Sequence, residues 1–363
     1  MFNLKNKNLY IYIPGIILLI FSIIFFIYSS PYQNDIKVAK WFENLFDKSE
    51  LLKYVSQYYL VAGNTDLFLV IIFMVMIIIK YKFLSKANKK EWYKQNYWIT
   101  NLILSILTSF FIIGWIYELV FYITSDTGFG VGIDAEIFLS VKYKITGKIF
   151  SGFYQFPILG YINYYLIKNF HKINVNKLNK FYIDAKKALL FLIINYIIVG
   201  SIKMFGGRPY YYNVIFNELF NKMSLEQQQN YIESGFRYGY YSETTNAYTG
   251  NVTGEWPWWR MNSIFNRSKE DFLNKNPYDY GFPSGHVVSS FSLVTFLYLK
   301  FDRNKKTSIW SIVFVYFLSL NAINMNLSTI LCRGHWMTDT SFSFIIILIT
   351  FFILDVYYKY RYK

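Results

Sequence analysis

Long apolar runs separated by short charged segments are the dominant pattern of this chain. Eight such runs are long enough, with their flanking residues, to cross a lipid bilayer as helices. They cover residues 11–28, 67–79, 98–122, 149–167, 188–204, 287–299, 309–327 and 337–357. Because a helix satisfies its own backbone hydrogen bonds inside a bilayer, the pattern predicts an all-α polytopic membrane protein with about eight transmembrane helices.

The polar segments between these runs divide the chain into two expected units. Residues 1–97 contain the first two runs and, between them, residues 31–65, which are expected on the outer surface. Residues 39–52 of that segment have the pattern of an amphipathic helix. Residues 98–363 contain the other six runs and a long outer loop, residues 210–282.

The outer loop carries two local signals. Ser224 and Gln227 match a helix capping box, which predicts a short surface helix after them. Trp256-Pro257-Trp258-Trp259 is an aromatic patch of the kind found at membrane interfaces. Both signals place the loop next to the bilayer surface.

Charge indicates how the chain is oriented in the membrane. It has 37 Lys and Arg against 22 Asp and Glu, and the cations gather in alternate segments between the apolar runs. Residues 80–94, for example, carry six lysines and one acid. The positive-inside rule therefore places these segments and both termini in the cytoplasm of a cell-membrane protein. Cations arranged in this way do not indicate a nucleic-acid partner.

Composition agrees with this class of protein. Hydrophobic residues make up 54% of the chain and aromatic residues 22%, more than is usual for a soluble domain. The single cysteine, Cys332, excludes an intrachain disulfide.

The first candidate for a functional site lies where the outer loop meets the sixth apolar run. Pro283-Ser284-Gly285-His286 reads as the start of a helix, with Ser284 as the N-cap and Gly285 allowing a ligand to approach the backbone. Unpaired N–H groups and the helix dipole favour an anion such as phosphate at this position. His286 adds a group that can exchange a proton near neutral pH.

Two other segments are expected at the same membrane boundary. Lys203 and Arg208 follow the fifth run, and Arg333 stands two residues before His335 at the start of the eighth run. The three cations suit phosphate oxygens. On a helix, His335 and Asp339 share a face, so that the carboxylate can orient the imidazole for nucleophilic attack. Together the segments predict a phosphoryl-transfer site without an acidic metal cluster.

These residues resemble the three signature motifs of the type 2 phosphatidic acid phosphatase family, within the lipid phosphatase and vanadium haloperoxidase superfamily. The resemblance covers about residues 98–357, so the last six runs are expected to form a phosphatase-like bundle. Phe282-Pro283-Ser284-Gly285-His286 matches the middle motif fully. The first motif departs from the family pattern, because four residues instead of six separate Lys203 from Arg208-Pro209. In the third motif, Ser328-Thr329 stands where the family has Ser-Arg.

The resemblance implies a two-step hydrolysis that needs no metal or other cofactor. His335 would attack phosphorus and form a phosphohistidine, and Asp339 would orient it. His286 would protonate the leaving oxygen and then activate water. The phosphoryl oxygens would be held by Lys203, Arg208, Ser284, the Gly285 N–H group and Arg333, the last replacing the missing motif arginine.

The expected location favours a lipid phosphate as substrate. Phosphatidic acid, phosphatidylglycerophosphate and a polyprenyl diphosphate all fit, and the sequence does not rank them. Two other classes of function stay open: a catalytically impaired family member that binds lipid or a partner, and a transporter that uses Glu118 and Lys203. Glu118 is a lone carboxylate inside the third run, so a structural role and a functional role are both compatible with its position.

Overall fold

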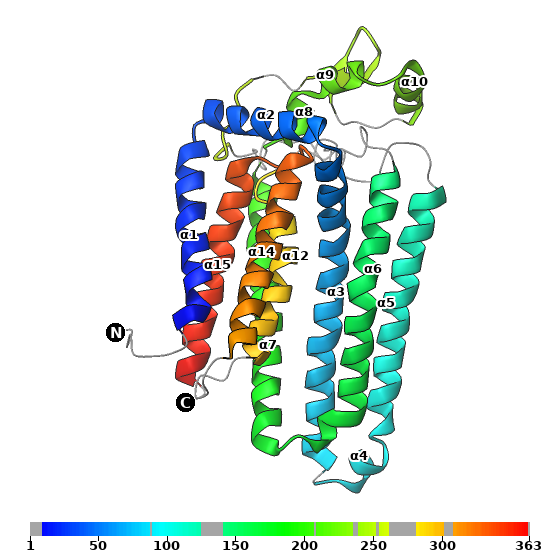
Figure 1. The fold of residues 1–363 in the computed structure, drawn as a ribbon, viewed down its shortest axis with the longest axis vertical. Helices are drawn as coiled ribbons and strands as arrows, with labels where there is room; N and C mark the ends of the chain where they lie inside the picture. Colours follow the sequence, from blue (N-terminus) through cyan, green and yellow to red (C-terminus); the bar gives the residue numbers. More distant parts are fainter. Residues whose placement is uncertain are drawn as a thin grey trace.

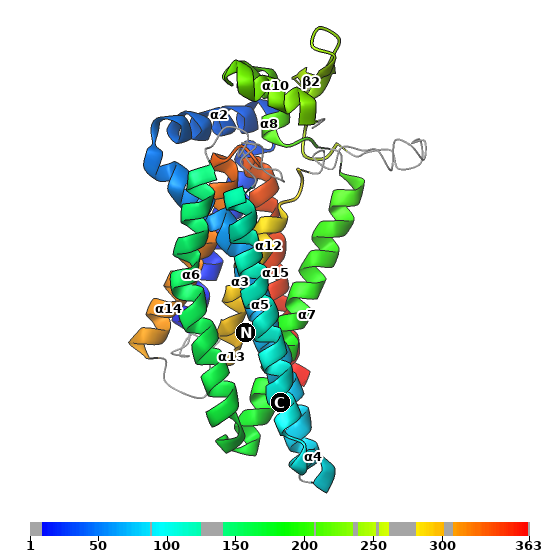
Figure 2. The same ribbon diagram turned by 90° about the vertical axis from the view of Figure 1, so that its right-hand side faces the viewer.

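Long helices run side by side in the computed structural model of this chain (Figure 1, Figure 2). The structure describes residues 9–87, 89–124, 141–206, 208–234, 239–251, 254–260, 281–300 and 308–361. The long helices are α1 (Leu9–Ser29), α3 (Glu50–Ala87), α5 (Trp98–Thr124), α6 (Val141–Tyr164), α7 (Val175–Phe205), α14 (Ile309–Leu331) and α15 (Met337–Arg361). All of them except α6 are long and apolar enough to cross a membrane by length and composition. The chain is therefore an all-α multi-pass membrane protein, as its sequence predicted.

The other two predicted spans are helical as well, but each departs from a regular α-helix. α6 is followed by a π-helical turn (Tyr165–Asn169) and a 3-10 turn (Phe170–Lys172), and the sixth run forms α12 (Gly285–Phe291), a 3-10 turn (Leu293–Thr295) and α13 (Phe296–Lys300). At the second break the Thr295 hydroxyl donates to the Ser292 carbonyl oxygen at 2.6 Å. Such side-chain bonds compete with the regular helix ladder.

The second transmembrane helix is longer than the sequence predicted. α3 begins at Glu50, so residues 50–65, expected on the outer surface, form its first half. Polar side chains along α3 are buried: Asp66 accepts hydrogen bonds from the Tyr154 hydroxyl at 2.6 Å and from Gln155 Nε2 at 2.8 Å. Both donors lie on α6. Polar residues that bond to a neighbouring helix look the same in the sequence as polar residues that face water. The sequence alone therefore assigned this segment to the surface.

An ion pair between a buried lysine and a half-exposed glutamate joins α5 to α6. Glu118 contacts Lys148, whose side chain is fully buried and also lies 3.3 Å from the Thr65 hydroxyl. The sequence around Glu118 contains no partner for its carboxylate, because Lys148 lies on the next helix. The pair supports a structural role for Glu118, and the transporter hypothesis loses the lone carboxylate on which it depended.

α2 (Tyr32–Lys48) lies across one end of the bundle, and both chain termini lie toward the other end (Figure 1). Its buried residues Tyr32, Asp35, Ala39 and Phe46 share one face. The helix confirms the amphipathic pattern, although it begins and ends earlier than residues 39–52.

Residues 210–260 add a small cap on the same end of the bundle. The cap contains α8 (Tyr211–Val214), α9 (Phe216–Asn221), α10 (Leu225–Ser234) and the antiparallel strands β1 (Tyr240–Ser242) and β2 (Ala247–Gly250). The predicted capping box is present: the Ser224 N–H donates to Gln227 Oε1 at 3.0 Å, and the Gln227 N–H donates to Ser224 Oγ at 3.2 Å. Buried aromatic residues of the cap pack together with Trp336, which ties the cap to the start of α15.

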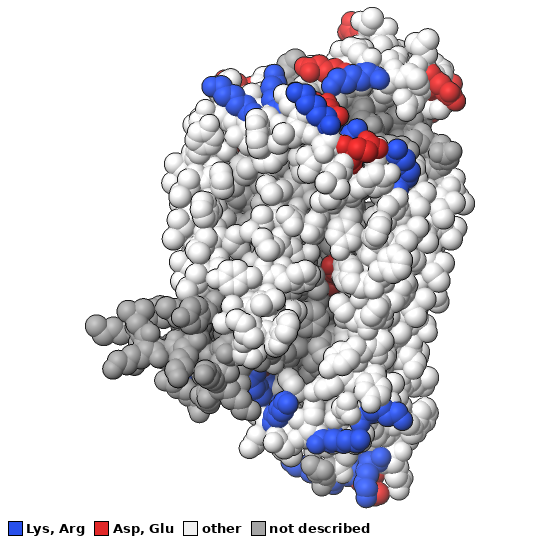
Figure 3. All heavy atoms as spheres, in the orientation of Figure 1, with Lys and Arg blue, Asp and Glu red and all other residues white. Residues whose placement is uncertain are grey.

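The two ends of the bundle differ in charge. Figure 3 shows mainly Lys and Arg at the end that carries α4 (Glu91–Gln95), whereas acids and cations are mixed at the end with α2. Exposed Lys82, Lys86 and Lys94 belong to the first end. The distribution has the asymmetry on which the topology prediction depends.

Candidate functional site

His335 lies in the tight turn between α14 and α15. Arg333 has a positive φ of 61°, which reverses the chain direction after α14. The N–H groups of Gly334 and His335 then donate to the Thr329 carbonyl oxygen at 3.0 and 3.1 Å, and α15 begins at Met337. These bonds hold the imidazole at the boundary between the two helices.

Asp339, in the first turn of α15, faces this histidine. Its Oδ2 atom is 3.4 Å from His335 Nδ1 and accepts a hydrogen bond from the Trp336 N–H at 3.0 Å. Both the imidazole and the carboxylate are buried. The two side chains therefore lie together, although His335 precedes α15 and does not share a helix face with Asp339 as the sequence predicted. The contact leaves Nε2 as the nitrogen that faces away from the carboxylate.

α12 brings the middle motif to the same place. The rings of His286 and His335 have centroids 6.0 Å apart, and the Ser284 N–H donates to the Asp339 carbonyl oxygen at 3.3 Å. The Ser284 hydroxyl is buried and has no hydrogen-bond partner in the structure. A buried polar atom left unpaired costs about 1–3 kcal/mol, so this hydroxyl indicates a place for a ligand.

Lys203 reaches the site from the end of α7. A Cβ atom added at Gly285 would lie 4.0 Å from Lys203 Cε, which places the lysine side chain beside the start of α12. Its Nζ atom is 5.7 Å from the centre of the Tyr210 ring, and that ring is 5.2 Å from the His335 ring. The three segments that the sequence assigned to one boundary therefore meet at one end of the bundle.

The surroundings of His335 favour its neutral form. Burial lowers the pKa of the imidazole, and the positive charge of Lys203 acts in the same direction. Asp339 and the Gly281 carbonyl group raise this pKa, but less than burial and Lys203 lower it. A neutral imidazole keeps the lone pair that a nucleophile needs.

Arg208 contacts carboxylates of the protein. Its side chain is 1% exposed and forms ion pairs with Asp35 Oδ2 and Asp339 Oδ1, both at 2.8 Å. Nε donates to the Trp256 carbonyl oxygen at 2.9 Å, and the guanidinium lies 4.3 Å from the centre of the Trp336 ring. The sequence argument placed phosphate oxygens against Arg208, whereas the structure places two carboxylates there.

Arg333 is held by α2 in a similar way. It forms ion pairs with Glu43, at 3.2 Å from Nε, and with Asp47 through Nη2. Its guanidinium also lies 5.5 Å from the centre of the Phe46 ring. The arginine expected to replace the missing family residue is thus bound to α2.

Sequence reasoning missed the acids of α2. Asp35, Glu43 and Asp47 lie on a helix assigned to the surface, yet they contact the two arginines of the motif segments. One signal could have identified Asp35. On a helix it shares a face with Ala39 and Phe46, and a single acid within an apolar stripe indicates a buried partner.

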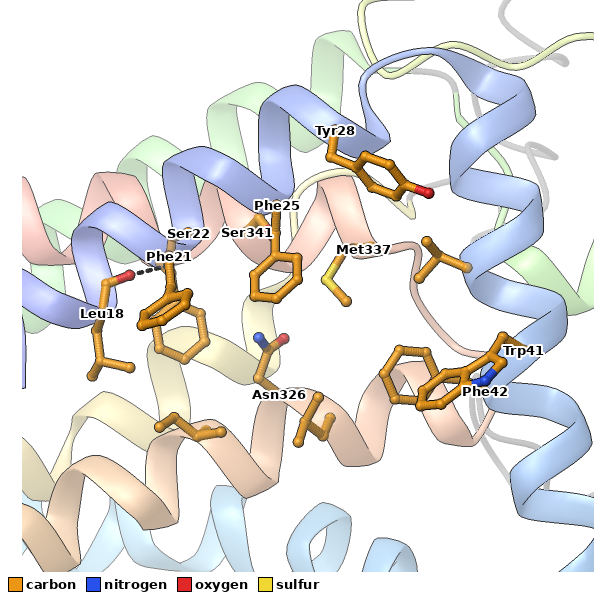
Figure 4. Close-up of a pocket in the computed structure, with 14 residues that line it drawn as sticks. Leu18, Phe21, Ser22, Phe25, Tyr28, Trp41, Phe42, Asn326, Met337 and Ser341 are labelled. Atoms are coloured by element: carbon orange, nitrogen blue, oxygen red, sulfur yellow. Dashed lines mark hydrogen bonds between the residues drawn. The ribbon is translucent and has the colours of Figure 1, made fainter.

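A groove of about 510 Å³ opens between α1, α2, α14 and α15 (Figure 4). Met337 and Ser341 of α15 line it among mainly apolar side chains. Helix residues turn by about 100° each, so Asp339 lies on the opposite face of α15 from these two residues. The groove is therefore behind the His335–Asp339 pair and is separate from the phosphate site.

A bound metal ion would need several His, Cys, Asp or Glu ligands close together among the described residues. Within them, no three His, Cys, Asp or Glu side chains are close enough to hold a metal ion together. The acids near the site contact Arg208 and Arg333 instead. Positive charge for a bound phosphate would come from Lys203 and from backbone N–H groups.

The fold and the site define a multi-pass membrane protein with two histidines, a carboxylate and a lysine gathered at one end of its helices. The chain belongs to the PAP2 superfamily, whose sequence model matches residues 184–363. This is a superfamily of lipid phosphatases. The matched region runs from α7 to the C-terminus and contains all three predicted motifs, and it is shorter than the expected resemblance over residues 98–357.

The chain is also similar to an uncharacterized protein of Mycoplasma capricolum subsp. capricolum. The two are 33% identical over 365 residues, which cover 96% of this chain and 93% of the relative. Because the similarity extends over nearly the whole of both proteins, it includes the helices before residue 184. No solved structure matches this chain.

Proposed function

We propose that this protein is a membrane phosphatase that hydrolyses a lipid phosphate monoester or diphosphate through a phosphohistidine, without a metal or other cofactor. One observation carries the proposal: His335 faces Asp339 at 3.4 Å and lies 6.0 Å from His286, ring centre to ring centre. The three side chains are thus close together, with His335 and Asp339 buried and His286 half-buried. Lys203 and the unpaired Ser284 hydroxyl complete the set.

The reaction follows from these positions. His335 Nε2 attacks phosphorus, forming an N–P bond as the bond to the leaving oxygen breaks. His286 gives that oxygen a proton and later removes one from the water that cleaves the N–P bond. Asp339 stabilises the positive charge that develops on the His335 ring. His286 thus loses one proton in the first step and regains one from water in the second, so the two steps are balanced in protons.

We assign phosphate binding to three of the five groups that the sequence predicted. Lys203, the Ser284 hydroxyl and the Gly285 N–H group surround the place where the phosphoryl oxygens would lie. Preorganised donors of this kind stabilise the charge of phosphoryl transfer, and each is worth about 3–4 kcal/mol. Arg208 and Arg333 are assigned to the carboxylates that they contact.

The substrate class rests on location. The site lies at one end of membrane-spanning helices, where a lipid can keep its tails in the bilayer while its headgroup enters. Phosphatidic acid, phosphatidylglycerophosphate and a polyprenyl diphosphate fit equally. Both termini lie toward the lysine-rich end, so we place the termini in the cytoplasm and the site on the extracytoplasmic side of the cell membrane.

The test is phosphate release from each of the three lipids by purified protein in EDTA. Wild type should release phosphate, and His335→Asn should not. His171→Asn is the matched control, because His171 is exposed in the turn between α6 and α7. Figure 1 shows that this turn lies at the end of the bundle opposite α2. Loss of activity in EDTA and its rescue by magnesium would contradict the histidine mechanism.

A catalytically impaired, lipid-binding protein is the second candidate. One observation favours it: both motif arginines are bound to carboxylates of the protein. In that case wild type and His335→Asn would show the same negligible phosphate release, and both would still bind the lipid.

A further inference from the structure

A continuous line of buried charged groups leads from α2 to His335. Asp35 Oδ2 is 2.8 Å from Arg208 Nη2, and Arg208 Nη1 is 2.8 Å from Asp339 Oδ1. The other oxygen of Asp339 faces His335 Nδ1 at 3.4 Å. Each of the four side chains is at most 2% exposed. Asp35 lies outside the family match, so the line joins the N-terminal helices to the matched region.

The charges along this line explain why Asp35 matters to the histidine. Arg208 alone would neutralise Asp339, and the imidazole would then face a pair without net charge. When Asp35 is ionised, the two carboxylates and one guanidinium carry one net negative charge, which opposes the positive charge of Lys203 on the other side of the imidazole. A buried negative charge favours positive charge on a neighbouring ring, and attack on phosphorus makes the His335 ring positive.

We propose that Asp35 is a positioning residue of the site. It balances Arg208, so that Asp339 keeps its negative charge toward His335 and holds the ring for attack. The coupling between Asp35 and His335 stands on geometry, and its effect on turnover rests on the proposed function. If Asp35 has this role, Arg208 serves to link Asp35 to Asp339 and does not bind phosphate. This agrees with the changed spacing of the first motif, to which Arg208 belongs.

Asp35 also has a local structural contact that the test must separate. It accepts hydrogen bonds from the Thr338 hydroxyl and, at 3.4 Å, from the Thr338 N–H in the first turn of α15. Burial raises the pKa of the Asp35 carboxyl, and Arg208 and Thr338 oppose that change. Asp339 and Tyr32 are titratable groups near Asp35, and Lys203, His286 and Tyr210 face the His335 ring from other elements. A substitution of Asp35 therefore changes both a charge and a helix cap.

The experiment is an NMR titration of full-length protein labelled at histidine. The chain has three histidines, so His171→Gln and His286→Gln identify the His335 signal. Asp35→Asn is compared with Asp47→Asn, which removes an α2 acid that contacts Arg333, and with Thr338→Val, which removes the hydroxyl but keeps the ion pair.

We expect the His335 midpoint to move to lower pH in Asp35→Asn and to stay in place in the other two variants. Phosphate release by Asp35→Asn should fall by about 10- to 100-fold in kcat with little change in KM, as for other residues that orient a catalytic group.

An unchanged midpoint in folded Asp35→Asn overturns the proposal. The same shift in Thr338→Val also overturns it, because the effect would then belong to the cap of α15. If Asp35→Asn does not fold, Asp35→Glu decides: it keeps the charge, so its midpoint should match wild type, and a lowered midpoint contradicts the proposal. Wild type that releases no phosphate refutes the proposed function alone, since the titration still reports the coupling.

Discussion

Arg333 joins the turn before α15 to α2 through ion pairs with Glu43 and Asp47. As a phosphate ligand it would act on turnover, whereas the structure shows it bound to α2. We therefore predict that Arg333→Ala chiefly loosens α2 from the bundle. Any loss of phosphate release should then follow from the loss of α2 and the Asp35 that it carries.

The size of the effect follows from burial. Arg333 is 2% exposed, Glu43 14% and Asp47 45%. Removing one partner of a buried pair costs about 3–5 kcal/mol, and an exposed pair contributes about 0–1 kcal/mol. Glu43 lies between these limits at about 2 kcal/mol, and half-exposed Asp47 adds less than about 1 kcal/mol. The total is about 3 kcal/mol, or roughly 100-fold in the equilibrium between docked and undocked α2.

Hydrogen exchange of the α2 amides measures this equilibrium directly. Arg333→Ala should exchange about 100-fold faster in α2, with α14 unchanged. Lys222→Ala is the matched control, because Lys222 contacts the same Asp47 at 3.6 Å from an exposed position, and its exchange should change by less than about fivefold. If α2 exchange in Arg333→Ala is unchanged and its turnover is as low as in His335→Asn, Arg333 does not hold α2 in place. It would then act as a phosphate ligand.

Four further predictions concern the site and the topology. Lys203→Met should lower kcat for phosphate release by about 100- to 1,000-fold, and near-normal turnover would remove Lys203 from the site. Because burial lowers the pKa of His335, the acid limb of kcat/KM should lie below about pH 6.5. The unfolded chain then binds this proton at higher pH than the folded one, so stability should fall as pH drops through about 6.5, and His335→Asn should lessen that fall. A cysteine at exposed Leu225 should react with an impermeant thiol reagent in intact cells and one at Lys94 only after permeabilisation, with buried Cys332 silent in both; the reverse labelling would invert the topology.

Much of the fold could be predicted from local patterns in the sequence. Each apolar run became a helical segment, because a span in lipid must pair its own backbone groups whatever its neighbours are. The capping box at Ser224 and the pairing of His335 with Asp339 are equally local, since each joins a residue just before a helix to one in its first turn, three or four positions later.

Contacts between helices were decided only by the tertiary structure. Asp35 and Arg208 are 173 positions apart, and nothing in either neighbourhood indicates the other. Glu118 and Lys148, or Asp66 and its donors on α6, are pairs of the same kind. A buried charge requires a partner, but the sequence does not say which element supplies it. The residue types for phosphoryl transfer were therefore evident from the chain, whereas the binding of both arginines by α2 follows from how the helices pack.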